Sequence, residues 1–153
     1  GVEGMSALSP RLAAIVDALP LRPGLRVLES GCGPGVAARA VAERLGPSGH
    51  VLGIDRSAKA IAQALAGSRE ALASGRLAFR EVAVEDFALA PGEARYDIAF
   101  AVRVGALDGR HPEAGRRAIE RLRAALVDGG RLFIDGGDPL RELALGGREA
   151  RPR

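Results

Sequence analysis

Apolar residues along the chain recur with two periods, one typical of strands and one typical of helices. Short apolar runs predict buried strands, and they cover residues 25–29, 50–54, 77–84, 96–102 and 131–135. Apolar residues spaced three or four apart predict helices, and they occur at 10–19, 36–45, 57–72, 112–126 and more weakly 140–145. In the third of these helices we expect Ile61, Leu65 and Leu72 to face inward. Strands and helices therefore alternate along most of the chain.

This alternation predicts an α/β fold, namely a doubly wound, mainly parallel five-stranded sheet in the order 3-2-1-4-5 with helices on both faces. Such sheets bind ligands at the carboxyl ends of their strands, where the winding reverses between strands one and four. We expect one domain over residues 9–145, after a flexible N-terminus at 1–8 and before a disordered basic tail at 146–153.

Composition removes several classes of function. The chain has 153 residues with one cysteine, Cys32, and two histidines, so we expect neither a disulfide framework nor a metal site. Aromatic residues make up 3% of the chain and most of its excess positive charge lies in the last 13 residues, which argues against nucleic-acid binding. No apolar run is long enough to cross a bilayer and no secretory leader is evident, so we expect a cytoplasmic protein without a membrane partner.

A glycine-rich loop, Glu29-Ser30-Gly31-Cys32-Gly33-Pro34-Gly35, follows the first predicted strand and opens a helix. Glycine allows a tight turn and lets the backbone approach a ligand closely. Residues 33–38 also satisfy the dinucleotide pattern GxGxxA. Asp55, at the end of the second strand, suits the hydroxyls of a ribose with either type of ligand. The loop and Asp55 together therefore indicate a nucleotide-like cofactor without saying which one.

Glu29 separates the two interpretations. It stands two residues before the first glycine, where a carboxylate repels a pyrophosphate but attracts a ligand that carries ammonium and sulfonium groups. The string E-x-G-x-G-x-G resembles motif I of the class I S-adenosylmethionine-dependent methyltransferases, and the resemblance extends over residues ~9–137. It implies S-adenosylmethionine as cofactor, S-adenosylhomocysteine as product and a small-molecule acceptor.

The same resemblance implies roles for the residues around the loop. Backbone groups of Gly31, Gly33 and Gly35 would contact the cofactor. Glu29 would hold its ammonium end, directly or through water. Asp55 would bind the ribose hydroxyls, with Arg56 beside the adenine.

Two later motifs match the family as well. Glu85-Asp86-Phe87 follows the third strand, where an acidic residue of these enzymes accepts a hydrogen bond from the adenine amino group. Asp86 matches that residue, and Phe87 would flank the ring. Glu85, beside them, would also contact the cofactor. The fourth strand would turn the backbone of Ala101 toward the methionine part of the cofactor.

The C-terminal part departs from the family pattern. The family sheet has seven strands, the last two of them a hairpin, whereas 18 residues follow Asp135 here, so we expect the hairpin to be absent. Strand five would then be an exposed edge, which predicts a covering segment, a homodimer through that edge, or marginal stability. Asp128 also replaces the usual proline of the turn into strand five.

No catalytic residue is assigned from the sequence. His111 precedes Pro112 at a helix start, which favours a capping or solvated role over that of a general base. We expect methyl transfer by in-line displacement. A non-catalytic S-adenosylmethionine-binding domain that acts through a partner, and an NAD-dependent oxidoreductase, remain the alternatives.

Overall fold

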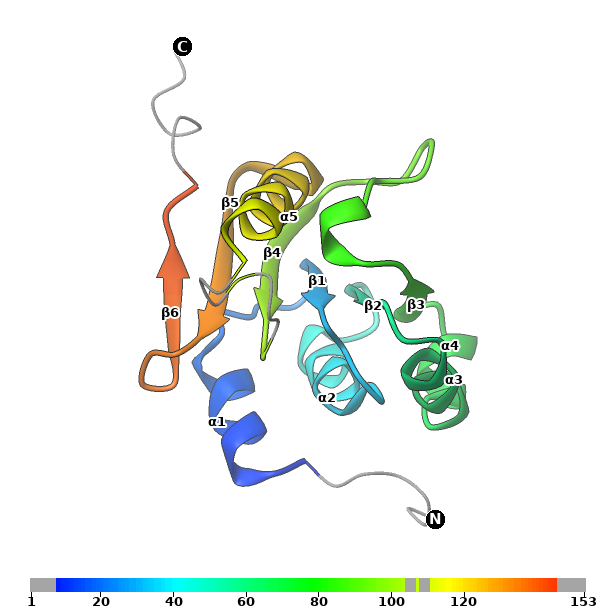
Figure 1. Ribbon diagram of the computed structural model, residues 1–153. Helices are drawn as coiled ribbons and strands as arrows, with labels where there is room; N and C mark the ends of the chain where they lie inside the picture. The colour runs from blue at the N-terminus through cyan, green and yellow to red at the C-terminus, as the bar shows by residue number, and fades with distance from the viewer. Residues whose placement is uncertain (1–7, 104–106, 108–110, 146–153) are drawn as a thin grey trace.

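The computed structural model describes residues 8–103, 107 and 111–145 (Figure 1). The expectations for residues 1–7 and 146–153 lie outside this part of the chain. In chain order the elements are α1 (Pro10–Ala18), β1 (Arg26–Ser30), α2 (Val36–Leu45), β2 (His50–Asp55), α3 (Ala58–Ala66), α4 (Arg69–Ala73), β3 (Leu77–Glu81), the 3-10 helix η1 (Val84–Asp86), β4 (Tyr96–Ala101), α5 (Pro112–Ala125), β5 (Leu126–Asp135) and β6 (Leu140–Leu143).

The strands form a single six-stranded sheet in the order β3-β2-β1-β4-β5-β6. The first five strands pair in parallel, which confirms the predicted order 3-2-1-4-5. Helices α1, α2, α3 and α4 lie on one face, and α5 with η1 lies on the other (Figure 1). The winding reverses between β1 and β4, so their carboxyl ends adjoin at the place where such sheets bind ligands.

Local capping signals set where the helices begin. Ser9 accepts a hydrogen bond from the backbone N–H of Leu12, and Ser57 does the same for Ala60. These side chains satisfy N–H groups that have no partner within the helix. The expected helix over 57–72 is interrupted at residues 67–68, so it forms α3 and α4. Our prediction for Leu65 was wrong: it is 43% exposed.

Strand β5 begins earlier than predicted. The chain passes from α5 directly into β5 at Leu126, and the pairing with β4 shifts register between Leu126 and Arg131. The Asp128-Gly129-Gly130 segment is therefore an irregularity within a strand, not a turn before one. Gly129 has a φ of 81°, which suits glycine at such a bulge.

The segment expected to be helical at 140–145 instead forms β6, which pairs antiparallel with β5 from Leu132↔Leu143 to Asp135↔Leu140. Arg131 and Glu142 reinforce the pair across the two strands at 2.8 Å. The sheet therefore has six strands, and the expectation that no strand follows the fifth is wrong. β6 is the covering segment expected for the edge of strand five. A homodimer through that edge loses its basis, because the backbone groups of β5 already have partners.

The core consists of two apolar clusters, one on each face of the sheet. On the α2 face, Val27, Val51 and Phe100 pack under α1 and α2. On the α5 face, Leu28, Leu52 and Leu132 pack under α5 and η1. Neighbouring residues of one strand thus serve opposite faces, as expected of a sheet buried on both sides. Among the described residues, no helix has the length and apolar character needed to span a membrane.

Candidate cofactor-binding site

The glycine loop leads from the end of β1 into α2 and is hydrogen-bonded to the end of β2. The backbone N–H groups of Gly31 and Cys32 both donate to the carbonyl oxygen of Ile54, at 2.8 and 2.9 Å. Gly31, Gly33 and Gly35 have φ values of 74°, 53° and 87°. These are left-handed conformations that other residues adopt only with strain, so the three glycines are required by the path of the loop.

Asp55 ties this loop to the start of α3. Its Oδ2 accepts a hydrogen bond from the N–H of Gly33 at 2.9 Å, and its Oδ1 accepts one from the N–H of Ser57 at 2.9 Å. A carboxylate offers about four acceptor positions, so each oxygen retains capacity for a further donor. The motif predicted a ligand contact for Asp55, whereas its role in holding the loop became visible only in the structure.

Glu29 lies at the carboxyl end of β1, next to this loop, and is 3% exposed. Its Oε1 is buried and has no hydrogen-bond partner among the described residues, and the same holds for the hydroxyl of Ser30. Burial, with a smaller contribution from the negative charge of Asp55, raises the pKa of Glu29 well above its ordinary value. Buried polar atoms almost always have partners, so the unpartnered Oε1 of Glu29 is a candidate contact for a ligand.

Cys32 lies inside the loop and is 5% exposed. Burial raises the pKa of its thiol far above the ordinary value, and the carboxylates of Glu29 and Asp55 raise it further. A thiol in this state is a poor nucleophile. The arrangement agrees with a packing role for Cys32.

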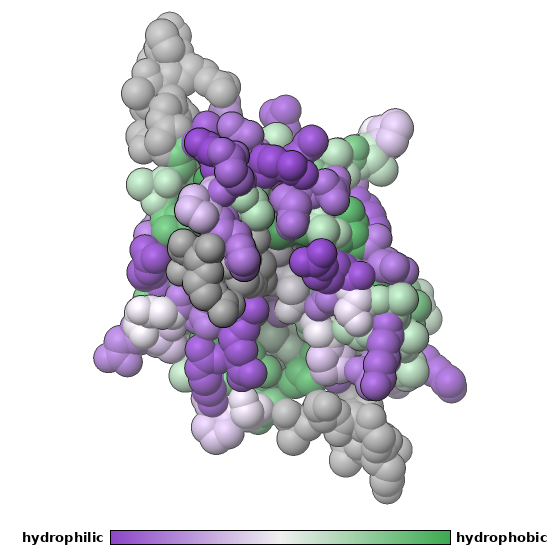
Figure 2. Space-filling view, in the orientation of Figure 1, coloured by the Kyte–Doolittle hydropathy of each residue, from purple (hydrophilic) through white to green (hydrophobic). Residues whose placement is uncertain are grey.

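A cleft of about 480 Å³ opens at the carboxyl ends of the strands. Figure 2 shows hydrophilic residues gathered over α5 and paler, less polar residues in the recess near the centre of this view. The cleft is lined by Ser30, Gly31, Asp55, Arg56, Val82, Ala83, Val84, Glu85, Arg103, His111 and Ala114. Its volume falls within the range of small-molecule sites, about 300–1,000 Å³.

Four of the residues predicted for the site line this cleft: Gly31, Asp55, Arg56 and Glu85. Gly33 lies in the loop above Asp55, and Ala101 is buried at the end of β4, where it pairs with Ser30. Gly35 packs closely, since a Cβ there would lie 2.9 Å from the ring of Phe79. These residues support the site without lining its wall.

The acidic segment after β3 is arranged differently from the prediction. Asp86 does not line the cleft and its carboxylate pairs with Arg117 of α5 at 3.2 Å. Phe87 is 1% exposed and packs in the core on the α5 face, not against the cleft. Glu85 is the carboxylate of this segment that faces the cleft. The 3-10 helix η1 causes this difference, because it turns successive side chains in different directions.

Sequence reasoning gave no role to the apolar residues 82–84, which carry no chemical signature, although they line the cleft. Arg103 also lines it, is exposed, and has a φ of 57°, which is unusual for a residue with a side chain. His111 precedes α5, makes no capping hydrogen bond through its side chain, and borders the same cleft. His111 is exposed at the N-cap position of α5, which agrees with the solvated alternative of the expectation.

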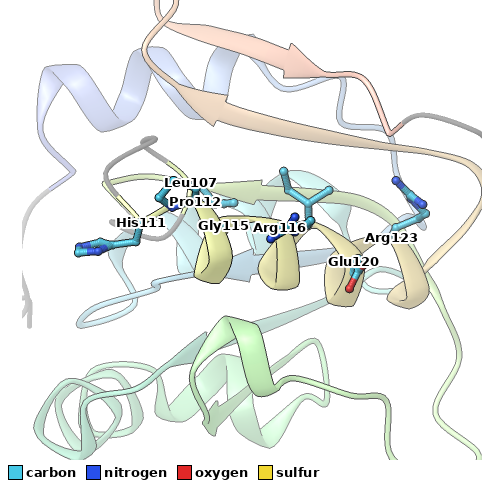
Figure 3. Close-up of a pocket in the computed structure, with 8 residues that line it drawn as sticks. Leu107, His111, Pro112, Gly115, Arg116, Glu120 and Arg123 are labelled. Atoms are coloured by element: carbon cyan, nitrogen blue, oxygen red, sulfur yellow. The ribbon is translucent and has the colours of Figure 1, made fainter.

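A second cavity, of about 520 Å³, runs along α5 (Figure 3). His111 lies at one end of it and also borders the cleft, so the two spaces adjoin there. The rest of its wall comes from Leu107 and from α5, including Pro112 and Ile119. It lies away from the glycine loop and contains none of the predicted cofactor-binding residues.

The electrostatics of the loop favour a positively charged ligand. Glu29 and Asp55 place two carboxyl groups beside it, and neither forms a salt bridge in the described part of the chain. A pyrophosphate would face both groups, whereas an ammonium group would give Glu29 the partner it lacks. Within the described residues, no group of three or more His, Cys, Asp or Glu side chains is placed to hold a metal ion.

Comparison with known proteins identifies the family of this chain. Residues 21–148 match the family of methyltransferase domains. The chain is 34% identical over 149 residues to nocamycin O-methyltransferase of Saccharothrix syringae, which covers 95% of this chain and 50% of the relative. It is 38% identical over 137 residues to protein-L-isoaspartate O-methyltransferase of Methylorubrum populi, which covers 89% of this chain and 57% of the relative.

A solved structure has the same fold. The S-adenosylmethionine-dependent methyltransferase of Geobacter sulfurreducens, in complex with S-adenosyl-L-homocysteine, superposes with a TM-score of 0.62 at 26% identity, covering 82% of this chain and 47% of that one. The chain therefore belongs to the methyltransferase domain family. It spans about half the length of the curated relatives described above.

Proposed function

We propose that this chain binds S-adenosylmethionine at the glycine loop and transfers its methyl group to an oxygen atom of a small-molecule acceptor. The unsatisfied Glu29 carboxyl group beside a loop of left-handed glycines is the observation that carries the proposal. Both curated relatives are named as O-methyltransferases, one of nocamycin and one of protein L-isoaspartate. These names support oxygen as the accepting atom.

The residues of the site fit this cofactor. Glu29 would face the ammonium group, and the free acceptor positions of Asp55 would receive the ribose hydroxyls. Glu85, which lines the cleft, would accept from the adenine amino group in place of Asp86, and Val82 and Arg56 would lie beside the ring.

Methyl transfer from a sulfonium uses a donor that is already activated, so the protein contributes orientation and exclusion of water. Bound S-adenosylmethionine supplies an electrophilic methyl group. His111, where the cleft meets the cavity along α5, is placed to receive a proton from an acceptor hydroxyl group.

Thermal unfolding with three ligands in parallel tests the cofactor. S-adenosylmethionine and S-adenosylhomocysteine should each raise the midpoint, because a ligand at 100 times its dissociation constant adds about 2.7 kcal/mol of stability. NAD should leave it unchanged. Asp55→Ala should remove most of the shift, whereas Asp86→Asn, which alters a carboxylate outside the cleft, should keep it. A shift with NAD alone would contradict the proposal.

Formation of S-adenosylhomocysteine tests the reaction. Hydroxyl and carboxyl small molecules should serve as acceptors, and an isoaspartyl peptide serves as the comparison because one relative is named for that group. Turnover only with the peptide would replace the small-molecule acceptor with a protein one. Binding without turnover on any acceptor would favour a non-catalytic domain.

A further inference from the structure

The environment of Glu29 has a consequence for how the proposed cofactor binds. Glu29 pairs in register with Gly53 of β2 and with Phe100 of β4, so both neighbouring strands present it with uncharged residues. Its Oε1 has no donor within the described part of the chain. An ionised carboxylate in such a place lacks every contact that normally stabilises it.

The titratable groups around Glu29 make ionisation still less favourable. From the end of β2, Asp55 acts on it with a charge of the same sign, and from the loop Cys32 is a neutral thiol. On α2, Arg39 donates instead to the carbonyl of Pro34 and the hydroxyl of Ser68. The buried residues of α2 are uncharged, namely Ala37, Ala38, Val41, Ala42 and Leu45.

Asp55 differs from Glu29 in its hydrogen bonds. Both oxygens of Asp55 accept hydrogen bonds from backbone N–H groups, those of Gly33 and Ser57. Of the two neighbouring acids, Glu29 is therefore the one with a buried oxygen that has no donor in the described part of the chain.

We infer that Glu29 is protonated in the cofactor-free protein and releases its proton to solvent when S-adenosylmethionine binds. The inference rests on the proposed function. The O–H bond of the carboxylic acid breaks, its electron pair stays on the carboxylate, and the proton passes to the buffer. The carboxylate then faces the ammonium group, which supplies the missing charge and hydrogen-bond donor.

This role makes Glu29 a specificity-determining residue that responds to the charge of the ligand. A cation can recover the energy of ionising Glu29, whereas a neutral or anionic ligand of similar shape cannot. Binding of S-adenosylmethionine should therefore tighten as the pH rises, by about tenfold per pH unit below the pKa of Glu29 in the free protein.

Isothermal titration calorimetry measures the released proton directly. S-adenosylmethionine is titrated into the protein at mildly acid pH in phosphate and in imidazole, two buffers with different ionisation enthalpies. This pH keeps the ligand ammonium group charged, since α-amino groups titrate at about 8. The wild-type protein should release about one proton per ligand bound. Glu29→Gln should release none, and its affinity should no longer vary with pH.

Two comparisons separate this inference from the proposed function. Asp17→Asn removes a carboxylate of α1 that is paired with Arg44 of α2 and does not line the cleft, and it should release the same proton as the wild type. Binding by the wild type without proton release would overturn the inference, while the proposal that S-adenosylmethionine is the cofactor would stand. Failure to bind S-adenosylmethionine would overturn both. If Glu29→Gln does not fold, the wild-type measurement in two buffers decides alone.

Discussion

Two glutamates of this protein, Glu93 and Glu29, differ in whether the fold supplies hydrogen-bond donors to their carboxyl groups. Glu93, in the turn before β4, accepts hydrogen bonds from the N–H of Ala90 at 2.7 Å, the hydroxyl of Tyr96 at 2.6 Å and the guanidinium of Arg80 at 3.1 Å. Glu29, at the end of β1, has a buried oxygen without a partner in the described residues.

The pKa values of the two groups follow from their surroundings. Burial raises the pKa of Glu93, but hydrogen bonds from Tyr96, Ala90 and Arg80, with the charge of Arg80, more than offset it, so its pKa is lowered. Burial raises the pKa of Glu29 with nothing to oppose it, and Asp55 adds to the effect. The fold gives Glu93 the partners that stabilise its charge, whereas it leaves Glu29 without them.

Removing the satisfied carboxylate should have the largest effect on stability. Glu93→Ala leaves the buried Tyr96 hydroxyl and the Ala90 N–H without their acceptor, and we expect the free energy of unfolding at neutral pH to fall by about 2–3 kcal/mol. The ion pair with Arg80 adds little to this loss, because the Arg80 side chain is partly exposed and solvent screens its charge. Urea unfolding measures this loss.

The pH dependence of that loss has a definite sign. Since the pKa of Glu93 is lowered in the folded state, its contribution is present above the ordinary Glu pKa and is lost as the pH falls through the lowered value. The difference between wild type and Glu93→Ala should therefore shrink in acid. A difference that stays constant with pH would show that the charge of Glu93 is not what stabilises the turn.

Replacing the unsatisfied carboxyl group should have a smaller effect of opposite sign. The raised pKa of Glu29 means that its contribution is present below the ordinary Glu pKa and is lost as the pH rises through the raised value. Glu29→Gln should therefore make the cofactor-free protein more stable than the wild type at alkaline pH. The free energy of unfolding of the wild type should fall with pH more steeply than that of the variant, by up to about 1.4 kcal/mol per pH unit. Urea unfolding of both proteins across neutral pH checks this, and identical slopes would contradict it.

The smallest change removes a single hydroxyl group. Tyr96 is fully buried and its ring packs in the core, so Tyr96→Phe keeps the packing and loses one hydrogen bond to Glu93. We expect a loss of about 1 kcal/mol, since Glu93 keeps its other two donors. The double variant with Glu93→Ala should show less than the sum of the two effects, because both break the same contact.

Local signals accounted for most of the elements. Ser9, Ser57 and Pro112 mark helix starts through contacts within a few residues, and the structure places helices directly after them or at them. The order of the first five strands followed from their alternation with helices. The strand that the sequence did not predict, β6, depends on a distant partner. It forms because β5 offers it a free edge, whereas its own four residues have little intrinsic preference for a strand.

The candidate site shows the same division. The left-handed turns of the loop were predictable because glycine adopts such conformations without strain. It was not predictable that Glu85 lines the cleft while Asp86 pairs with Arg117, because this depends on η1 and on α5, which is distant in the chain. Ala83 and Val84 line the cleft through their position alone, without any chemical signature in the sequence.

The sequence by itself determined the α/β alternation, the glycine loop and the presence of Glu29 and Asp55 beside it, since each of these depends on residue type and short-range geometry. Only the tertiary structure decided which carboxylates are satisfied. Glu93 and Glu29 are the same residue type, and neither carries a local mark of its state. The physical reason is that burial and hydrogen-bond partners come from segments far apart in the chain, and these decide whether a charge is stabilised or left for a ligand to complete.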